Sequence, residues 1–319
     1  MGYRYGPVVV GVDGSADSVG ALRWAADEAC QKGRELLAVH ARDPATPSDG
    51  GADIAGQAAE EALRWRPGVC ATGVTDSDAP AEVLRRHTQR ARLVVVGSHG
   101  SGGNLAEPLG SVSDALCRQA HCPVLIVHEA RRWADPFAVL PHVGPVVVGF
   151  DGSDAARRAL RLAFEEAAGR SRRLVVIQVW KHPQMWMPGE HRDQHPDGPH
   201  CTDLTSDETA VHEALVSAAE PWHAQFPLVD MELRSEPGDP AEALIVASQW
   251  AMLMVLGTRC STDAVQPTNP SVKRRVLRTM ACPALIAHDV AAYTGASSAG
   301  LGLCADLPGP PVAADGGGH

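Results

Sequence analysis

A glycine-rich segment has the residue types and the spacing of a phosphate-binding loop. Gly97 and Gly100 stand three residues apart, and after nine further residues come Gly110 and Ser111. An apolar run over residues 93–96 precedes the segment, and the residues after it resemble the first turn of a helix. Glycines let a backbone approach a ligand closely, and a helix start offers N–H groups and a positive dipole end. The segment therefore predicts an anion pocket, whose usual occupant is a phosphate group.

The unit that contains this segment occurs twice in the chain. Its opening, Pro-Val-Val-Val-Gly-Val-Asp-Gly-Ser from Pro7, returns with one change from Pro145, and its closing run from Cys122 returns from Cys282. Repeats this long indicate duplicated domains rather than a solenoid, and 319 residues suit two domains. We expect one domain over 1–130, a linker over 131–143 and a second domain over 144–290. A Gly-, Ala- and Pro-rich tail over 291–319 is expected to be disordered.

Short apolar runs alternate with helical periodicity in both copies, which predicts α/β domains. In the first copy we expect strands at 8–12, 36–40, 69–74, 93–96 and 124–127, and helices at 16–32 (capped by Ser15), 54–64, 80–90 and 111–120. In the second copy we expect strands at 146–150, 174–180, 228–234, 252–256 and 285–287, and helices at 155–168, 206–225, 240–249 and 272–280. The predicted fold is two tandem domains, each a five-stranded parallel sheet with helices on both faces. Ligands of such sheets bind at the carboxyl ends of the strands.

The strand that ends in Asp-Gly-Ser, the glycine array and the Cys-Pro-Val-Leu-Ile-Val ending together resemble the universal stress protein family. The resemblance is to the tandem form, and it covers residues 5–129 and 143–289. It implies the five-stranded sheet of the adenine-nucleotide α-hydrolase type, with ATP bound across the carboxyl edge. It also implies a regulatory role in the stress response.

The family pattern, carried over by motif, implies a contact for each part of the nucleotide. Asp13 would hold the ribose, Gly11 and Val12 would border the adenine, and Ala41 would touch the base. The floor of the site would be formed by Val96, Gly97, His99 and Gly100, and the phosphates would be bound by backbone N–H and hydroxyl groups of Gly110, Ser111, Val112 and Ser113. The residue types agree, because a carboxylate suits sugar hydroxyls and serine hydroxyls suit phosphate. No lysine follows as in a Walker A loop, and an accompanying Mg²⁺ has no assigned ligand.

The second copy departs from the glycine pattern. Cys260 stands in place of Gly100, and Pro270, which has no N–H to donate, stands in place of Gly110. Asp151 and Ser271 remain, and Asp151 is interpreted as a turn and capping residue. The basic run over 273–275 is either a site for another anion or a solvated face. We therefore expect one competent nucleotide site, in the N-terminal domain.

The composition of the chain limits the kinds of partner that it is expected to bind. The net charge of −10 argues against broad binding to nucleic acid, which needs a basic surface. No signal peptide or membrane-length apolar run is found, so a cytoplasmic protein without membrane contact is expected. The eight cysteines form no C-x-x-C pair and are expected to be reduced and structural. The histidines of segment 181–203 are interpreted as a polar loop, with a metal site as the weaker alternative.

Two other functions stay open beside the regulatory one. One is an enzyme with slow ATP hydrolysis or phosphoryl transfer, although no general base is evident and no catalytic residue is assigned. The other is an interaction protein with two vestigial sites. The two domains are expected to pack as an internal pseudo-dimer, because each leaves an edge strand to cover. A homodimer and an unidentified signalling partner are further expectations.

Overall fold

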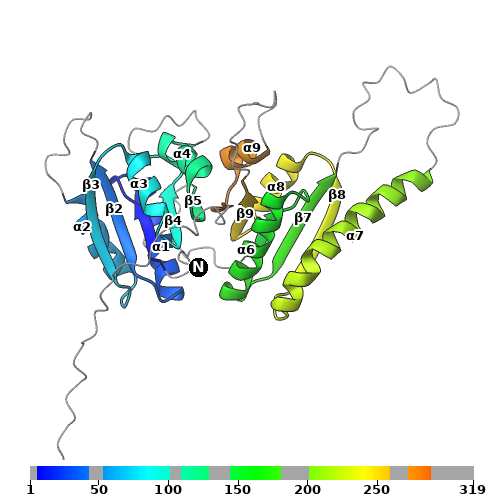
Figure 1. Cartoon of the computed structure of the whole chain (residues 1–319), viewed down its shortest axis with the longest axis horizontal. Coiled ribbons are helices and arrows are strands. Elements are labelled where there is room, and N and C mark those ends of the chain that lie inside the picture. The colour runs from blue at the N-terminus through cyan, green and yellow to red at the C-terminus, as the bar shows by residue number, and fades with distance from the viewer. Residues whose placement is uncertain are drawn as a thin grey trace, which may run out of the picture.

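The computed structural model describes residues 6–42, 53–100, 109–128, 144–180, 201–258 and 272–288. The strands of the first half are β1 (Val8–Gly11), β2 (Leu36–Arg42), β3 (Ala71–Ser77), β4 (Leu93–Gly97) and β5 (Val124–Val127). Those of the second half are β6 (Val146–Gly149), β7 (Leu174–Trp180), β8 (Met231–Pro237), β9 (Leu253–Gly257) and β10 (Ala284–Ala287). They form one ten-stranded sheet of order β3-β2-β1-β4-β5-β10-β9-β6-β7-β8 (Figure 1). Each half contributes five parallel strands, as expected.

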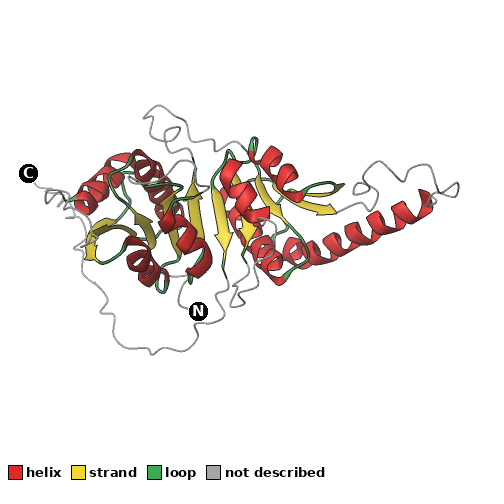
Figure 2. Cartoon of the chain, turned by 90° about the horizontal axis from the view of Figure 1, so that it is seen from above, coloured by secondary structure: helices red, strands yellow, loops and turns green. Residues whose placement is uncertain are grey.

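Helices cover both faces of the sheet, which runs through the middle of the molecule in Figure 2. One face packs against α1 (Ala16–Gln31), α2 (Ile54–Trp65), α6 (Asp154–Arg170) and α7 (Cys201–Gln225). The other face packs against α3 (Pro80–Thr88), α4 (Ser111–Gln119), α8 (Pro240–Ser248) and α9 (Val272–Thr279). Alternate strand residues face the two layers, so Val8 and Val10 belong to one core and Val9 to the other. The predicted α/β class is confirmed.

The expected elements are found in the expected order, with small shifts at their ends. Ser15 caps α1, because its hydroxyl oxygen accepts the N–H of Ser18. The two outer strands, β3 and β8, begin two to three residues later than the apolar pattern predicted. Val69 and Val229 are buried in the turns that precede these strands and cover the core from there. The apolar pattern therefore predicted correctly that Val69 and Val229 are buried, but it placed them in strands that begin only after them.

The two halves join through one antiparallel strand pair. β5 and β10 pair with Leu125 opposite Leu285, and every other strand pair of the described sheet is parallel. The expectation that each half covers an edge strand of the other is confirmed. Strand direction therefore reverses once across the sheet, between β5 and β10.

Two buried histidines cross this seam reciprocally. His128 follows β5, and its Nε2–H donates to the carbonyl oxygen of Leu277 in α9 over 2.9 Å. His288 follows β10, and its Nε2 lies 3.3 Å from the carbonyl oxygen of Cys117 in α4. Burial lowers the pKa of each imidazole to about 4, so both are neutral at pH 7. The same contact made in both directions is the mark of a two-fold interface.

The helix carbonyls that accept these bonds are available for a local reason. The amide that would bond the carbonyl oxygen of Cys117 within the helix belongs to His121, and it donates instead to the hydroxyl of Thr88 over 3.1 Å. In the second half the amide of Ala281 donates to the hydroxyl of Ser248 over 3.0 Å. Each half thus unwinds the end of one helix with its own hydroxyl and offers the released carbonyl to the other half.

A buried ion cluster closes the seam on the opposite face of the sheet. Lys32, the C-cap residue of α1, lies 2.9 Å from Glu166 of α6 and 3.5 Å from Glu28. Arg170 of α6 is paired with both glutamates. All four side chains are at most 15% exposed, and burial lowers the pKa of Lys32 to about 8. Two cations and two carboxylates therefore balance one another across the two halves.

Acid is expected to weaken the seam through the two histidines. Their folded pKa of about 4 lies below the ordinary value of about 6.5, so the unfolded chain binds more protons between these values. Stability is complete above about pH 6.5 and is lost as the pH falls towards 4, by up to about 3 kcal/mol per histidine. Urea unfolding as a function of pH measures this slope. The double variant His128→Gln/His288→Gln should flatten the slope, and an unchanged slope would contradict the assignment.

Breaking the ion cluster is expected to be costly. Arg170→Met removes one cation from between two buried carboxylates, which should lower the free energy of unfolding by about 3–5 kcal/mol. Arg64 is the control, because its pair with Glu61 leaves the arginine side chain 67% exposed. Arg64→Ala should cost less than about 1 kcal/mol. Equal losses in the two variants, measured by chemical denaturation, would show that the cluster does not hold the halves together.

Candidate functional site

The sheet brings the two predicted ligand loops together. β1 and β4 are parallel neighbours, with Val8 opposite Leu93 and Val10 opposite Val95. The segment that follows β1 and the segment that follows β4 therefore leave the sheet side by side at its carboxyl edge. The sequence placed these loops on one edge, and strand order makes them adjacent.

The carboxylate of Asp13 lies directly against Gly100. One oxygen, Oδ1, accepts the N–H of Ser15 over 3.0 Å and closes an Asx turn. The other faces the glycine, since a Cβ built on Gly100 would lie 2.8 Å from Oδ2. No ordinary Cβ contact is that short, so a side chain at residue 100 would displace the carboxylate. The glycine array and the aspartate are thus two sides of one site.

The start of α4 presents backbone donors at the same edge. Gly110 is the N-cap residue, in extended backbone and without a side-chain capping bond. The first helical residues, Ser111, Val112 and Ser113, have N–H groups that precede any intrahelical acceptor. Ser111 is exposed and Val112 is half-buried. N–H groups without an acceptor at the positive end of a helix dipole are the donors that anions use in proteins.

Two of the expected phosphate donors serve the protein instead. The N–H of Gly110 donates to the carbonyl oxygen of Ser98 over 2.8 Å. The hydroxyl of Ser113, which is buried, donates to the carbonyl oxygen of Gly97 over 2.7 Å. Both bonds tie the start of α4 to the end of β4. In the structure these two groups hold the loop in place, and the assignment of Gly110 and Ser113 to phosphate binding stays a prediction.

The apolar residues assigned to the base lie beside this edge. Val12 and Val96 are buried, and Ala41 is half-buried against the core layer of α3 and α4. Gly11 ends β1 opposite Val39, so Ala41 lies just beyond that strand end. Apolar residues of both core layers therefore end near the start of the Asp13 turn.

Sequence reasoning missed His40, which bonds to the backbone of the segment after β1. Its ring is buried, and Nδ1–H donates to the carbonyl oxygen of Val12 over 2.9 Å. The signal was a polar residue within an otherwise apolar strand. His99, which the sequence did place here, has Nδ1 3.2 Å from the hydroxyl oxygen of Ser98. Gly97 admits the first turn of α1, because a Cβ there would lie 3.0 Å from Asp17.

The second half keeps the frame of the site but changes its groups. Asp151 is exposed and accepts both the N–H and the hydroxyl of Ser153, which is the predicted capping role. Lys273 stands where the first half has Ser113, and its amine donates to the hydroxyl of Thr258 over 2.9 Å. Arg275 is paired with Asp239 on the surface. The changed residues Cys260 and Pro270 lie outside the described residues.

The expectations for metal sites, membrane spans and cysteines can be compared with the described part of the chain. Within the described ranges no group of three His, Cys, Asp or Glu side chains is placed to hold a metal ion. The histidine-rich segment 181–200 falls outside these ranges, so its role stays a prediction. None of the helices in the described part of the chain combines the length and hydrophobicity of a membrane span. Among the cysteines whose side chains the structure describes, five are free thiols, and Cys117, Cys122 and Cys282 of these are buried.

Comparison with known proteins defines the class. The profile of the universal stress protein family matches residues 4–128 and 142–288, so the chain belongs to this family. A universal stress protein from Mycobacterium tuberculosis is 30% identical over 305 residues, which cover 88% of this chain and 96% of the relative. One from Mycobacterium bovis is 28% identical over 300 residues, with the same two coverages.

Solved structures confirm the fold. The crystal structure of a universal stress protein from Archaeoglobus fulgidus matches 89% of this chain and 98% of its own, with a TM-score of 0.60 and 17% identity. A protein of unknown function from Pseudomonas aeruginosa matches 89% of this chain and 92% of its own, with a TM-score of 0.57 and 16% identity. At these identities the likeness establishes the tandem fold alone.

The loop bond of Gly110 can be tested by substitution. The φ of Gly110 is −65°, which proline adopts without strain. Gly110→Pro removes the hydrogen bond to Ser98 and also places the ring Cδ against the Ser98 carbonyl oxygen, so it should cost more than the bond alone, at least about 1 kcal/mol of unfolding free energy. Gly110→Ala is the matched control, since its Cβ would meet neighbours at 3.4 Å, an ordinary contact. The assignment is wrong if thermal or urea unfolding gives the alanine variant the same loss as the proline variant.

Proposed function

We propose that this universal stress protein binds an adenine nucleotide, ATP, in its N-terminal half and acts as a regulatory protein of the stress response. The observation that carries the proposal is the packing of the Asp13 carboxylate against Gly100. An acceptor for sugar hydroxyls, a glycine that leaves room beside it and the start of α4 then lie at one sheet edge. These are the groups that a nucleoside phosphate needs.

Each part of the nucleotide has its own contacts in this proposal. The carboxylate of Asp13 accepts hydrogen bonds from the ribose, and Val12 and Ala41 offer apolar contacts to the adenine. The N–H groups of residues 111–113 and the exposed hydroxyl of Ser111 bind the phosphates. The bonds of Gly110 and Ser113 keep these donors in position. Support for ATP comes from this donor set and from the family resemblance, and a Mg²⁺ ion would accompany the phosphates without a protein ligand that we can assign.

The proposal places one nucleotide on each chain. In the second half, residue 260 is a cysteine and residue 270 a proline, and Lys273 replaces the serine that ties the helix to the strand. The amine of Lys273 is turned towards the seam and bonded to Thr258. We propose that the unit over 1–130 carries the nucleotide and that the unit over 144–290 supports it through the seam.

Calorimetric titration with ATP tests the site. Wild type should bind one ATP per chain, and Asp13→Ala should weaken binding by about tenfold or more, because a charged acceptor for the ribose is lost. Gly100→Cys, which installs the residue of the second half, should weaken binding to a similar degree, since the new Cβ displaces the same carboxylate.

Asp151→Ala is the matched control, since this aspartate forms the same turn in the second half. It should leave both affinity and stoichiometry unchanged. Two sites per chain, or a loss in Asp151→Ala equal to that in Asp13→Ala, would refute the assignment to the first half. No binding by wild type would refute nucleotide binding altogether.

A further inference from the structure

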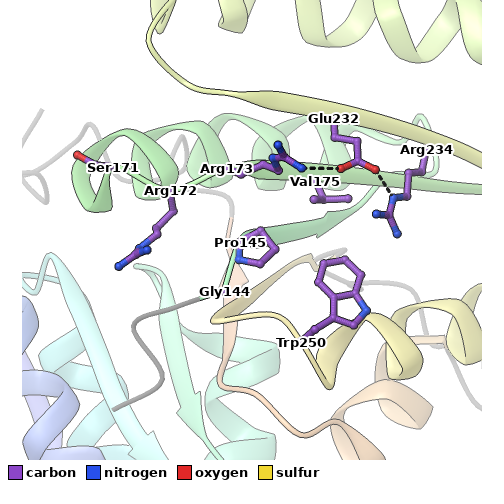
Figure 3. Close-up of a pocket in the computed structure, with 9 residues that line it drawn as sticks. All are labelled: Gly144, Pro145, Ser171, Arg172, Arg173, Val175, Glu232, Arg234 and Trp250. Atoms are coloured by element: carbon purple, nitrogen blue, oxygen red, sulfur yellow. Dashed lines mark hydrogen bonds and ion pairs between the residues drawn. The ribbon is translucent and has the colours of Figure 1, made fainter. Parts of the chain in front are cut away.

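A cavity of about 410 Å³ lies at the amino ends of the strands of the second half (Figure 3). Its lining comes from the turn between α6 and β7, the first residues of β7 and β8, the residues just before β6, and Trp250 after α8. The volume lies in the range of small-molecule sites. The cavity is at the opposite end of these strands from Thr258, so it is not the counterpart of the nucleotide site.

The polar wall of the cavity is basic. It carries the guanidinium groups of Arg172, Arg173 and Arg234 and one carboxylate, that of Glu232. Three cations against one anion leave a positive cavity, even when Asp230, which pairs with Arg173 over 2.7 Å, is added. In a chain of net charge −10 such a local excess of positive charge stands apart from the rest of the protein. The lining therefore favours an anion.

Glu232 holds two of these arginines in place, and some of the N–H groups of the arginines have no acceptor in the described part of the chain. Its Oε1 accepts the Nε–H of Arg234 over 2.7 Å, and its Oε2 lies 3.4 Å from Arg173. Figure 3 shows the carboxylate between the two guanidinium groups. Among the described residues, the terminal nitrogens of Arg234 and the whole guanidinium of Arg172 have no acceptor. A held guanidinium with free N–H groups is ready to bind an oxyanion.

The other wall is aromatic and apolar. Trp250 is 39% exposed, and the guanidinium of Arg234 lies 5.1 Å from its ring centroid. Pro145 and Val175 contribute apolar surface beside it. The N–H of Met252 donates to the carbonyl oxygen of Pro145 over 3.0 Å, which locks the two segments together. A rigid wall of this kind suits the face of a flat ring.

The turn that carries two of the arginines has an unusual backbone. Ser171 has a φ of 52°, and it is the one residue other than glycine with positive φ in the described chain. The first half has Gly33 at this position, with a φ of 58°. Serine carries a Cβ that makes this conformation costly, and such residues cluster at functional sites. The second half thus tolerates strain next to this cavity that the first half avoids.

The first half provides an internal comparison. Its sheet has the same registers, with Leu36 opposite Ala71 as Leu174 is opposite Met231. At the positions of Glu232, Arg234 and Trp250 it has Thr72, Val74 and Arg90. It therefore lacks the carboxylate between two arginines and the aromatic wall. These groups belong to the second half alone.

We propose that this cavity binds a small flat anion, an aromatic or similarly planar ring that carries one carboxylate or phosphate group. The ring lies against Trp250, and the oxyanion accepts hydrogen bonds from Arg234, whose guanidinium lies above the same ring. Glu232 remains in place and limits the charge that the cavity accepts, so a triphosphate or a nucleic-acid backbone does not fit. The half without the glycine array thus has a ligand site of its own.

The test is titration of the full chain with phenyl phosphate, benzoate and inorganic phosphate, followed by calorimetry and by the indole N–H signals in NMR spectra. At low ionic strength, either aromatic anion should bind in the millimolar range or tighter, and inorganic phosphate should bind at least about tenfold more weakly. Arg234→Gln and Trp250→Leu should each weaken the aromatic probe by about tenfold. Both side chains are exposed, so both variants should remain folded.

Arg34→Gln is the matched control, because Arg34 occupies in the first half the position of Arg172. It should bind the probes as wild type does. The proposal is overturned if neither aromatic anion binds, or if Arg234→Gln and Trp250→Leu bind them as tightly as wild type. It is also overturned if inorganic phosphate binds as well as phenyl phosphate, because the ring would then contribute nothing.

Discussion

The antiparallel pairing of β5 with β10 is the constraint on which the rest of the molecule depends. It turns two five-stranded sheets into one, so that each core layer continues from the first half into the second. It also brings α4 against α9 on one face and α1 against α6 on the other. The histidine bonds and the buried ion cluster are consequences of that placement. A hydrophobic seam alone would permit sliding, whereas directional bonds to backbone carbonyls specify one register.

Duplication gave both halves the same frame, and the side chains then diverged. Strand registers, the Asp-Gly-Ser turn and the released helix carbonyl recur in both halves. At residues 113 and 273 the two halves differ, with a serine that ties α4 to β4 and a lysine that reaches the seam. The frame is preserved because core packing and strand pairing depend on it. Loop residues change more freely because few buried contacts constrain them.

The carbonyl group of Cys117 links the changed residues of the second half to the proposed nucleotide site. Cys117 lies in α4, the helix whose first residues would bind phosphates, and its carbonyl oxygen faces His288 and Thr258 of the second half. Thr258 in turn accepts the amine of Lys273. The helix whose first N–H groups are proposed to bind phosphate is therefore held at its other end by the second half. This is the physical sense in which a half without the glycine array supports the half that has it.

Much of the fold was readable from the sequence. Apolar runs and the repeated motifs predicted ten strands, their order along the chain and the parallel arrangement within each half, because strand period and burial are local properties. The loop that follows β4 and the one that follows β1 were assigned to one edge for the same reason. Strand boundaries at β3 and β8 were misplaced, since buried turn residues such as Val69 look like strand residues in a pattern.

Other features were decided only by the tertiary structure. No pattern announces that the N–H of Gly110 bonds to Ser98, that His40 supports Val12, or that Arg234 stacks on Trp250, because each contact joins segments that meet only when the sheet forms. The sequence by itself determined which residue types stand at the strand ends, and hence the family. Strand order and the reversal at β5 and β10 determined which of those residues touch, since long-range pairing sets distances that spacing along the chain does not contain.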